Sequence, residues 1–389
     1  MLSALSRATL AGAALLVIAF PHPAEAQFGG LARKVKERVQ APSRPAGQAE
    51  SPAGTPAAAA ALAGGNREVW ANYDFIPGQR TLFYSDFTDD GVGDFPRRLE
   101  FKGGAMEIVE LDGQRALKAS AASGFVVPLP EVLPQRFTLE IDVINRNSMS
   151  VAQPTIKVYG GTAVKTDVDR ERTRVTFGHT GWEVGGGGTE SQANFTSEEA
   201  AGYLGRPVSV RVLGDGAYLK LYADGRRLAN VPNAAFMRGR GIFVAVEARD
   251  GEANAVYITR IRIAESDVSV YDALAATGRW ATQGILFASG KATIRPESAP
   301  ALKAIAAALT GHPDLRIRIE GHTDNVGSAE ANLRLSEERA AAIKAALVSE
   351  HGIAPERLEI SGLGDTKPAA DNGTPEGRSS NRRVEVVKL

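Results

Sequence analysis

The clearest pattern of hydrophobic and polar positions lies between residues 315 and 347. Leu315, Ile317 and Ile319 alternate with charged residues, which predicts a strand with one buried face. Gly321 ends the alternation, and a short polar turn follows. Apolar residues then recur at helical spacing, at Leu333, Leu335, Ala340, Ile343 and Leu347. This second pattern predicts an amphipathic helix that begins near Asn332.

Further elements of the same kind flank this pair. A strand is expected at Ile285 to Phe287, and a helix that includes Pro300 and Leu309 should end at Gly311. Another strand is expected at 357–362, then a long polar loop at 365–380 and a last strand at 383–388. The order β-α-β-α-β-loop-β predicts an α+β domain over residues 283–389, with its helices on one face of a small mixed sheet.

The middle of the chain, residues 67–265, has a different pattern. Short alternating segments are separated by turn signals, and helical periodicity is nearly absent, which favours an antiparallel β-sandwich. Two of these segments flank Asp224-Gly225 and predict a hairpin. The strands are expected at 137–145, 155–159, 174–177, 208–213, 218–222, 227–231, 241–247 and 255–263.

The first 66 residues lack such patterns. An apolar run from Leu10 to Phe20 follows Arg7, and Ala24-Glu25-Ala26 has the small residues of a cleavage site. Residues 1–26 therefore read as a secretory signal peptide that is cut after Ala26. Residues 27–66 are dominated by Pro, Ala and Gly and are expected to be a disordered linker. Residues 266–282 are expected to be a connector between the two folded regions.

Composition narrows the range of functions. Lys and Arg total 45, as do Asp and Glu, so no strong global charge directs the chain to nucleic acid. The chain has no cysteine, which excludes disulfides, thiolate metal sites and a lipid-modified N-terminal cysteine. No cofactor and no metal are expected. We predict an exported protein of the periplasm or the cell outer membrane.

Two charged residues stand out at the junction between the predicted strand and helix. Asp324 follows the strand, and Arg339 lies about two turns into the helix. Strand-to-helix crevices of this kind often hold ligands. A fixed carboxylate and a fixed guanidinium suit a ligand that carries an ammonium and a carboxylate on one carbon. His322, in the same turn, is interpreted as a hydrogen-bonding residue and not as a metal ligand.

The motifs in this region are similar to those of the OmpA-like peptidoglycan-binding domain. They are Gly-His-Thr-Asp at 321–324, Leu-Ser-Glu-Glu-Arg-Ala at 335–340 and Asn-Arg-Arg-Val-Glu at 381–385. The resemblance implies that Asp324 holds the ammonium of diaminopimelate on a stem peptide, and that Arg339 holds its carboxylate. It also implies that Asn332 lines the pocket, which groups around Thr323 complete. Arg382 is expected to support the sheet and loop. The chain departs from the family at 287–290, where an acidic residue is often found.

The middle region resembles laminin-G or concanavalin-like jelly rolls in its pattern alone, and is expected to bind a glycan or a protein. An alternative function is an enzyme acting on envelope glycan through Glu140, although the second carboxylate that such enzymes need is absent. Another is a wall-gripping subunit of a secretion or motility machine. We expect no catalytic residue. The acidic segment from Asp86 to Asp94 suits either a calcium site or an Asp- and Gly-rich turn.

Overall fold

The computed structural model describes residues 72–389 except 147–154, 163–172, 187, 235, 250–253 and 267–268. The predicted signal peptide and linker lie outside the described residues. Within the described ranges, no helix combines the length and the apolar character needed to cross a membrane.

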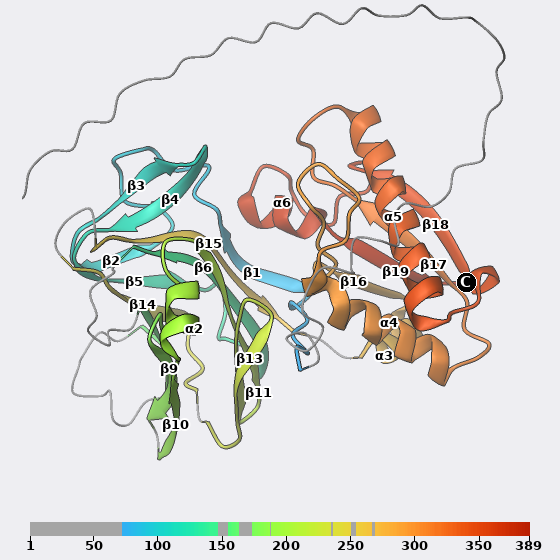
Figure 1. Ribbon diagram of the computed structural model, residues 1–389. Helices are drawn as coiled ribbons and strands as arrows, with labels where there is room; N and C mark the ends of the chain where they lie inside the picture. Colours follow the sequence, from blue (N-terminus) through green and yellow to red (C-terminus); the bar gives the residue numbers. More distant parts are fainter. Residues whose placement is uncertain are drawn as a thin grey trace, which may run out of the picture. The chain divides into compact units, whose positions relative to one another are not determined.

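The middle region forms two large antiparallel sheets (Figure 1). One has the order β13-β12-β11-β6-β15-β4-β3, with β1 also paired to β15. Its strands are β1 Arg80–Ser85, β3 Met106–Leu111, β4 Gln114–Ala119, β6 Arg136–Asn145, β11 Pro207–Asp215, β12 Tyr218–Ala223, β13 Arg226–Val231 and β15 Val256–Glu265. The two strands at its centre, β6 and β15, pair along nearly their whole length.

The second sheet has the order β10-β9-β8-β7-β14-β5-β2. Its strands are β2 Glu100–Gly103, β5 Ala122–Pro128, β7 Ile156–Gly160, β8 Arg174–Gly178, β9 Gly181–Gly186, β10 Thr189–Asn194 and β14 Gly241–Glu247. A short helix, α2 (Ser197–Gly202), follows β10 and begins with a capping box formed by Thr196 and Glu199.

The core of the sandwich lies between these sheets and is built by alternation. Leu139, Ile141 and Val143 of β6 are buried against residues of the second sheet, such as Phe125 and Val244. The other face of β6 carries Glu140 and Asp142, as period-2 alternation requires. The antiparallel sheets expected from the sequence are confirmed. The more specific jelly-roll assignment remains a prediction.

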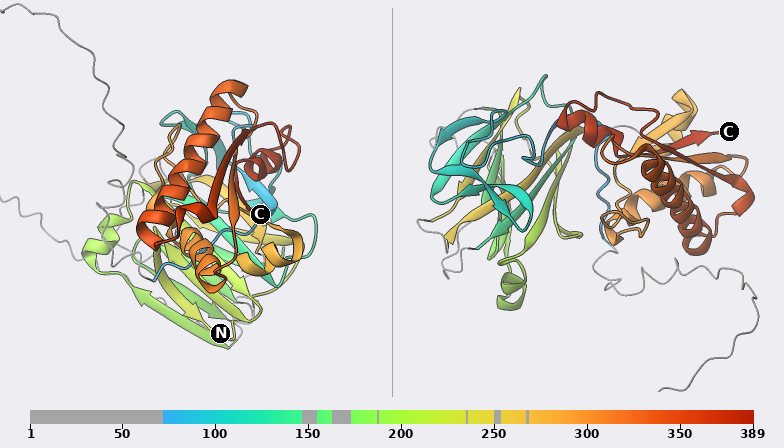
Figure 2. Two further views of the ribbon diagram at one scale, coloured as in Figure 1. Left: turned by 90° about the vertical axis from the view of Figure 1, so that its right-hand side faces the viewer. Right: turned by 90° about the horizontal axis from the view of Figure 1, so that it is seen from above.

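The C-terminal region contains a sheet of order β16-β19-β17-β18. Its strands are β16 Arg279–Thr282, β17 Ile317–His322, β18 Leu358–Gly364 and β19 Val384–Lys388. Only β17 and β18 run parallel, so the sheet is mixed, as predicted. The helices are α3 Val270–Thr277, α4 Ala299–Gly311, α5 Ala329–His351 and α6 Pro375–Asn381, with 3₁₀ turns at Pro296–Ser298 and Pro355–Arg357. Figure 2 shows α4 and α5 alongside this sheet, and their apolar residues share a hydrophobic cluster with it.

Two elements differ from the expectation. The first strand of the sheet is at 279–282, within the expected connector, whereas Phe287 makes only an isolated bridge to Ile294. Strand β16 is short, but it completes the ladder beside β19, and Trp280 is buried in the domain's cluster. The loop expected at 365–380 contains α6, which begins at the Thr374 cap.

Candidate functional site

The polar turn after β17 is held in a single conformation by hydrogen bonds. The amide of Thr323 donates to the Gly364 carbonyl at 2.9 Å, which ties the turn to β18. The Thr323 hydroxyl donates to the Asp324 carbonyl at 2.8 Å. Asn332, buried at the start of α5, donates from its side-chain nitrogen to the carbonyls of Asp324 and Val326, each at 3.2 Å. The backbone on both sides of Asp324 is therefore fixed by side chains that the sequence singled out.

Helix α5 can lie close to this turn because two glycines face it. A Cβ atom on Gly321 would come within 2.3 Å of the Ser336 carbonyl oxygen, and one on Gly362 within 2.5 Å of the Glu337 nitrogen. Ser336 uses the space: its hydroxyl accepts a hydrogen bond from the Gly364 amide at 2.9 Å. These close approaches place Asn332 and Arg339, seven residues apart and thus on one helix face, toward the sheet.

Arg339 lies half-buried on that face. Its Nε donates to the Lys291 carbonyl at 3.2 Å, and its guanidinium carbon lies 4.9 Å from the centre of the Phe287 ring. Burial lowers the pKa of Arg339, while the charge of Asp324 acts in the opposite direction. The two residues predicted to act together are thus electrostatically coupled. The segment at 287–291, where the chain departs from the family pattern, contributes a ring and a carbonyl, with no acidic side chain.

Asp324 has a different direct partner. Its Oδ2 lies 2.7 Å from Nη1 of Arg382, and its Oδ1 accepts a hydrogen bond from the Val326 amide at 3.2 Å. Arg382 also donates from Nη2 to the hydroxyl of Tyr84, at 3.0 Å. The expectation that Arg382 supports the sheet and loop stays a prediction, and the structure adds that its guanidinium lies directly on the Asp324 carboxylate.

A cavity of about 260 Å³ lies beside Arg339 and Arg382, and its lining does not include Asp324. Arg339, Arg382 and His322 line it from the C-terminal region, and Tyr84, Arg260 and Arg262 line it from the sandwich. Most of the charged residues in the lining are arginines, which suit anionic groups, although Glu140 also lines the cavity and pairs with Arg260 and Arg262. The contribution of Tyr84 could not be found from the sequence, since it lies 298 residues from Arg382 and belongs to no shared motif.

His322 lies beside two carboxylates, and the three residues could approach a common ion. Glu320, His322 and Glu385 each offer a ligand atom, and these atoms lie within 4.8 Å of one another. The carboxylates are, however, already paired: Arg279 contacts Glu385 at 2.6 Å and Glu320 at 3.3 Å, and Arg383 contacts Glu385 at 2.7 Å. The acidic charge is thus balanced by guanidinium groups. Burial lowers the pKa of His322 to about 4, which keeps its ring neutral at pH 7.

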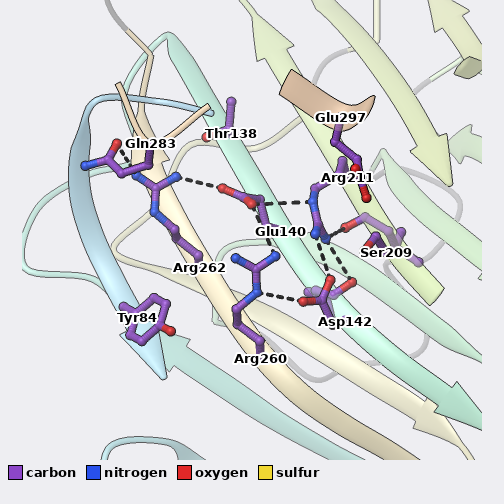
Figure 3. A network of polar contacts seen from close by, with 12 residues as sticks. Tyr84, Thr138, Glu140, Asp142, Ser209, Arg211, Arg260, Arg262, Gln283 and Glu297 are labelled. Carbon is purple, nitrogen blue, oxygen red and sulfur yellow. Dashed lines mark hydrogen bonds and ion pairs between the residues drawn. The ribbon is translucent and has the colours of Figure 1, made fainter. Parts of the chain in front are cut away.

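Glu140, the residue behind the enzymatic alternative, lies in a network of ion pairs (Figure 3). Period-2 alternation places Glu140 on the face of β6 that points away from the sandwich core, but Glu140 is buried there. Its carboxylate oxygens lie 2.7 Å from Arg262, 3.4 Å from Arg211 and 3.6 Å from Arg260. Burial raises the pKa of Glu140, but these three charges outweigh it and hold the pKa below its ordinary value. A carboxylate of this kind does not release a proton near pH 7, as a general acid must.

The acidic segment at 86–94 also has partners within the chain. Asp86 accepts hydrogen bonds from Thr88 at 2.7 Å and from the Tyr84 hydroxyl at 3.1 Å. Asp89 pairs with Arg378, and Asp90 accepts from the Arg97 amide at 3.2 Å. Three of its four carboxylates are therefore used in turns and in a contact with α6, which fits the turn interpretation of this segment.

Comparison with known proteins places the C-terminal region among described relatives. Residues 286–382 match the OmpA family. The outer-membrane lipoprotein YfiB of Pseudomonas aeruginosa is 43% identical over 103 residues, which cover 26% of this chain and 61% of that protein. The peptidoglycan-binding protein ArfA of Mycobacterium tuberculosis is 42% identical over 103 residues, which cover 26% of this chain and 31% of that protein.

Solved structures match a similar share of the chain. The cell wall anchor of the type VI secretion system (T6SS) of Pseudomonas aeruginosa is 32% identical to this chain. The match covers 30% of this chain and 92% of the anchor, with a TM-score of 0.26. The matched region spans 28% of the Acinetobacter baumannii outer membrane protein Omp38 and 61% of YfiB, so this chain spans less than two thirds of the length of these relatives. The region that carries Asp324 and Arg339, residues 286–382, is a domain of the OmpA family.

Proposed function

We propose that the C-terminal domain binds peptidoglycan non-covalently and anchors an exported envelope protein to the cell wall. The ligand is the diaminopimelate of the stem peptide, whose side chain carries an ammonium and a carboxylate on one carbon. Asp324 receives the ammonium and Arg339 the carboxylate. Asn332 and Thr323 hold the turn that presents the Asp324 carboxylate. No bond is broken.

The observation that carries this proposal is the arrangement of Asp324 and Arg339. They come from different elements, the end of β17 and the face of α5, and each is held by hydrogen bonds to backbone groups. The charge of Asp324 raises the pKa of Arg339, whereas the direct ion pair of Asp324 is with Arg382. Opposite charges that are fixed but not paired with each other suit a zwitterionic group, whose ammonium must displace Arg382 from Asp324 or share the carboxylate with it. Arginine also matches a carboxylate in a bidentate way that lysine does not.

The names of the relatives support the same conclusion. ArfA is described as peptidoglycan-binding, and the Pseudomonas structure as a cell wall anchor. Others are outer-membrane lipoproteins and porins, which fits our proposal of a periplasmic or outer-membrane location. The sandwich is then a second binding module for a glycan or protein. The environment of Glu140 weighs against an enzyme that uses this residue as its acid.

The proposal is tested by binding to purified sacculi. Arg339→Ala should abolish co-sedimentation of the full chain, and Arg339→Lys should weaken it, because the bidentate contact is lost. Arg334→Ala is the matched control, because Arg334 lies on the same helix, is exposed, and pairs only weakly with Glu338 at 3.8 Å. Circular dichroism establishes that each variant is folded. A folded Arg339→Ala protein that still sediments with sacculi would refute the proposal.

A further inference from the structure

The sandwich contacts the OmpA domain at α6 through charged groups. Glu376 accepts a hydrogen bond from the Tyr84 amide at 3.0 Å and pairs closely with Arg98. Arg98 in turn donates to the Tyr84 carbonyl at 2.9 Å. Arg378 reaches both oxygens of Asp89, at 3.1 and 2.9 Å. We call this set of contacts the α6 dock. Because charge-assisted hydrogen bonds are stronger than neutral ones, the α6 dock fixes the position of Tyr84 relative to α6.

The α6 dock brings Tyr84 to Arg382, the residue that follows α6. The Tyr84 hydroxyl donates to Asp86 at 3.1 Å and accepts from Arg382 at 3.0 Å. The guanidinium carbon of Arg382 also lies 5.5 Å from the centre of the Tyr84 ring. One amino group of Arg382 is therefore held by the sandwich, and the other lies on Asp324 at 2.7 Å.

Arg382 thus takes the place that a ligand ammonium needs. One Asp324 oxygen is used by Arg382, and the other accepts the Val326 amide. An ammonium can bind there only if it displaces Arg382 or shares the carboxylate with it. When the binding-competent state is only partly populated, the apparent affinity falls by the competent fraction.

We propose that the sandwich sets the affinity of the OmpA domain for its ligand. With the α6 dock closed, Tyr84 holds Arg382 across Asp324, and this internal cation competes with the ligand ammonium. When the α6 dock opens, Arg382 loses one of its two anchors and Asp324 becomes accessible. Tyr84 and Arg382 are positioning residues in this scheme. The inference rests on the proposed function for the class of ligand, a group with an ammonium and a carboxylate on one carbon.

The test is calorimetric titration of the full chain with a diaminopimelate-containing stem tripeptide. Arg382→Gln removes the competing cation, Tyr84→Phe removes its anchor, and Asp89→Asn weakens the α6 dock at a distance from Asp324. Each should bind about three- to tenfold more tightly, the factor that corresponds to one partly exposed ion pair or hydrogen bond. Arg316→Gln and Tyr218→Phe are matched controls, since they make the same chemical changes at exposed positions outside these contacts, and should leave the affinity unchanged.

The outcomes separate this inference from the proposed function. If the wild type binds, Asp324→Asn abolishes binding, and neither Arg382→Gln nor Asp89→Asn binds more tightly, the competition is refuted while the proposed function stands. Weaker binding by Arg382→Gln would make Arg382 a ligand contact and would also refute the competition. If neither the wild type nor Arg382→Gln binds the tripeptide, both proposals fail.

Discussion

Glu140 carries a negative charge where there is almost no water. It is 4% exposed, and Arg262, Arg211 and Arg260 surround its carboxylate. Asp142 shares two of these partners: it lies 2.7 Å from Arg211 and 2.6 Å from Arg260. A buried charge is tolerable only when it is paired, and removing one partner leaves the others uncompensated. The network therefore stabilises the fold only as a complete set.

Removing the charge of Glu140 should strongly destabilise the protein. We expect Glu140→Gln to lower the free energy of unfolding by about 3–5 kcal/mol in urea titrations at pH 7, because the buried Arg262 then loses its carboxylate partner, while Arg211 and Arg260 keep only Asp142. Glu110→Gln, at an exposed position of β3, is the control and should change it by about 0.5 kcal/mol at most. A loss below about 1 kcal/mol for Glu140→Gln would mean that the network contributes little.

The same network gives stability a defined pH dependence. The pKa of Glu140 is lower in the folded protein than in the unfolded chain, so the unfolded chain takes up protons first as the pH falls. The stabilisation from this group is present above the ordinary glutamate pKa of about 4.3 and is lost as the pH falls below it. In Glu140→Gln, the free energy of unfolding should therefore fall less than in the wild type as the pH is lowered below this value.

The sequence identified part of the candidate site at the level of residues. Asp324, Asn332 and Arg339 sit in local motifs around one strand and one helix, so their proximity follows from the order of elements. The contacts of Arg382 with Asp324 and Tyr84 were not predicted, because they join regions far apart in the chain. The burial of Glu140 was missed for the same reason, since period-2 alternation predicts which face a residue lies on and not what covers that face.

At the level of elements, the distance between α5 and its strands decides whether the site can form. Gly321 and Gly362 leave no room for a Cβ atom beneath the helix. Because β17 ends at the Asp324 turn and α5 carries Arg339, a shift of the helix changes the separation of the two charges. The glycines therefore position the site without touching a ligand.

We expect Gly362→Ala to displace α5 and to weaken both folding and binding. The added methyl group would lie 2.5 Å from the Glu337 nitrogen, and such overpacking costs about 1–3 kcal/mol. Urea unfolding and sacculi binding measure the two effects. Gly311→Ala is the control. Gly311 is the last residue of α4, and an added methyl group would have no other atom within 4 Å, so this substitution should be neutral or slightly stabilising. Full binding by Gly362→Ala would show that the spacing of α5 is not critical.

The elements that the sequence predicted well are those with long, regular patterns. Strands such as β6 and β11 alternate over nine or ten residues, and α5 has helical spacing over several turns. Strand β16 has only four residues, and the neighbouring apolar run at 285–287 gave a stronger signal. Helix α6 is short, polar and contains Gly377, so its stability comes from the Thr374 cap and from contacts that no local pattern contains.

At the level of the whole molecule, the sandwich and the OmpA domain have separate hydrophobic clusters. They meet through the polar groups of the α6 dock and through Ile76, which precedes β1 and packs against the OmpA cluster. The larger clusters share no residue, one lying between the two sandwich sheets and the other between the mixed sheet and its helices. The α6 dock and the Arg262 to Gln283 hydrogen bond, at 3.1 Å, connect the two regions. Interfaces built from polar contacts open more easily than hydrophobic ones, so the α6 dock is suited to reversible opening.

Thermodynamic linkage gives this arrangement a consequence that can be measured without altering the protein. If the closed α6 dock weakens ligand binding by some factor, the bound ligand must weaken the α6 dock by the same factor. The Tyr84 amide reports on the α6 dock, because it donates to Glu376. Hydrogen exchange of this amide should therefore become about three- to tenfold faster when the stem tripeptide saturates the full chain.

The direction of that change is diagnostic, since a bound ligand usually slows exchange. The Val326 amide, which donates to Asp324, should exchange more slowly in the same experiment, because the ligand covers the turn. The amide of Val210, at the centre of β11 in the sandwich, should not change and serves as the control. Slower exchange at Tyr84 would mean that ligand binding closes the α6 dock. In that case the sandwich would increase the affinity of the OmpA domain for its ligand, and Arg382 would not compete with the ligand.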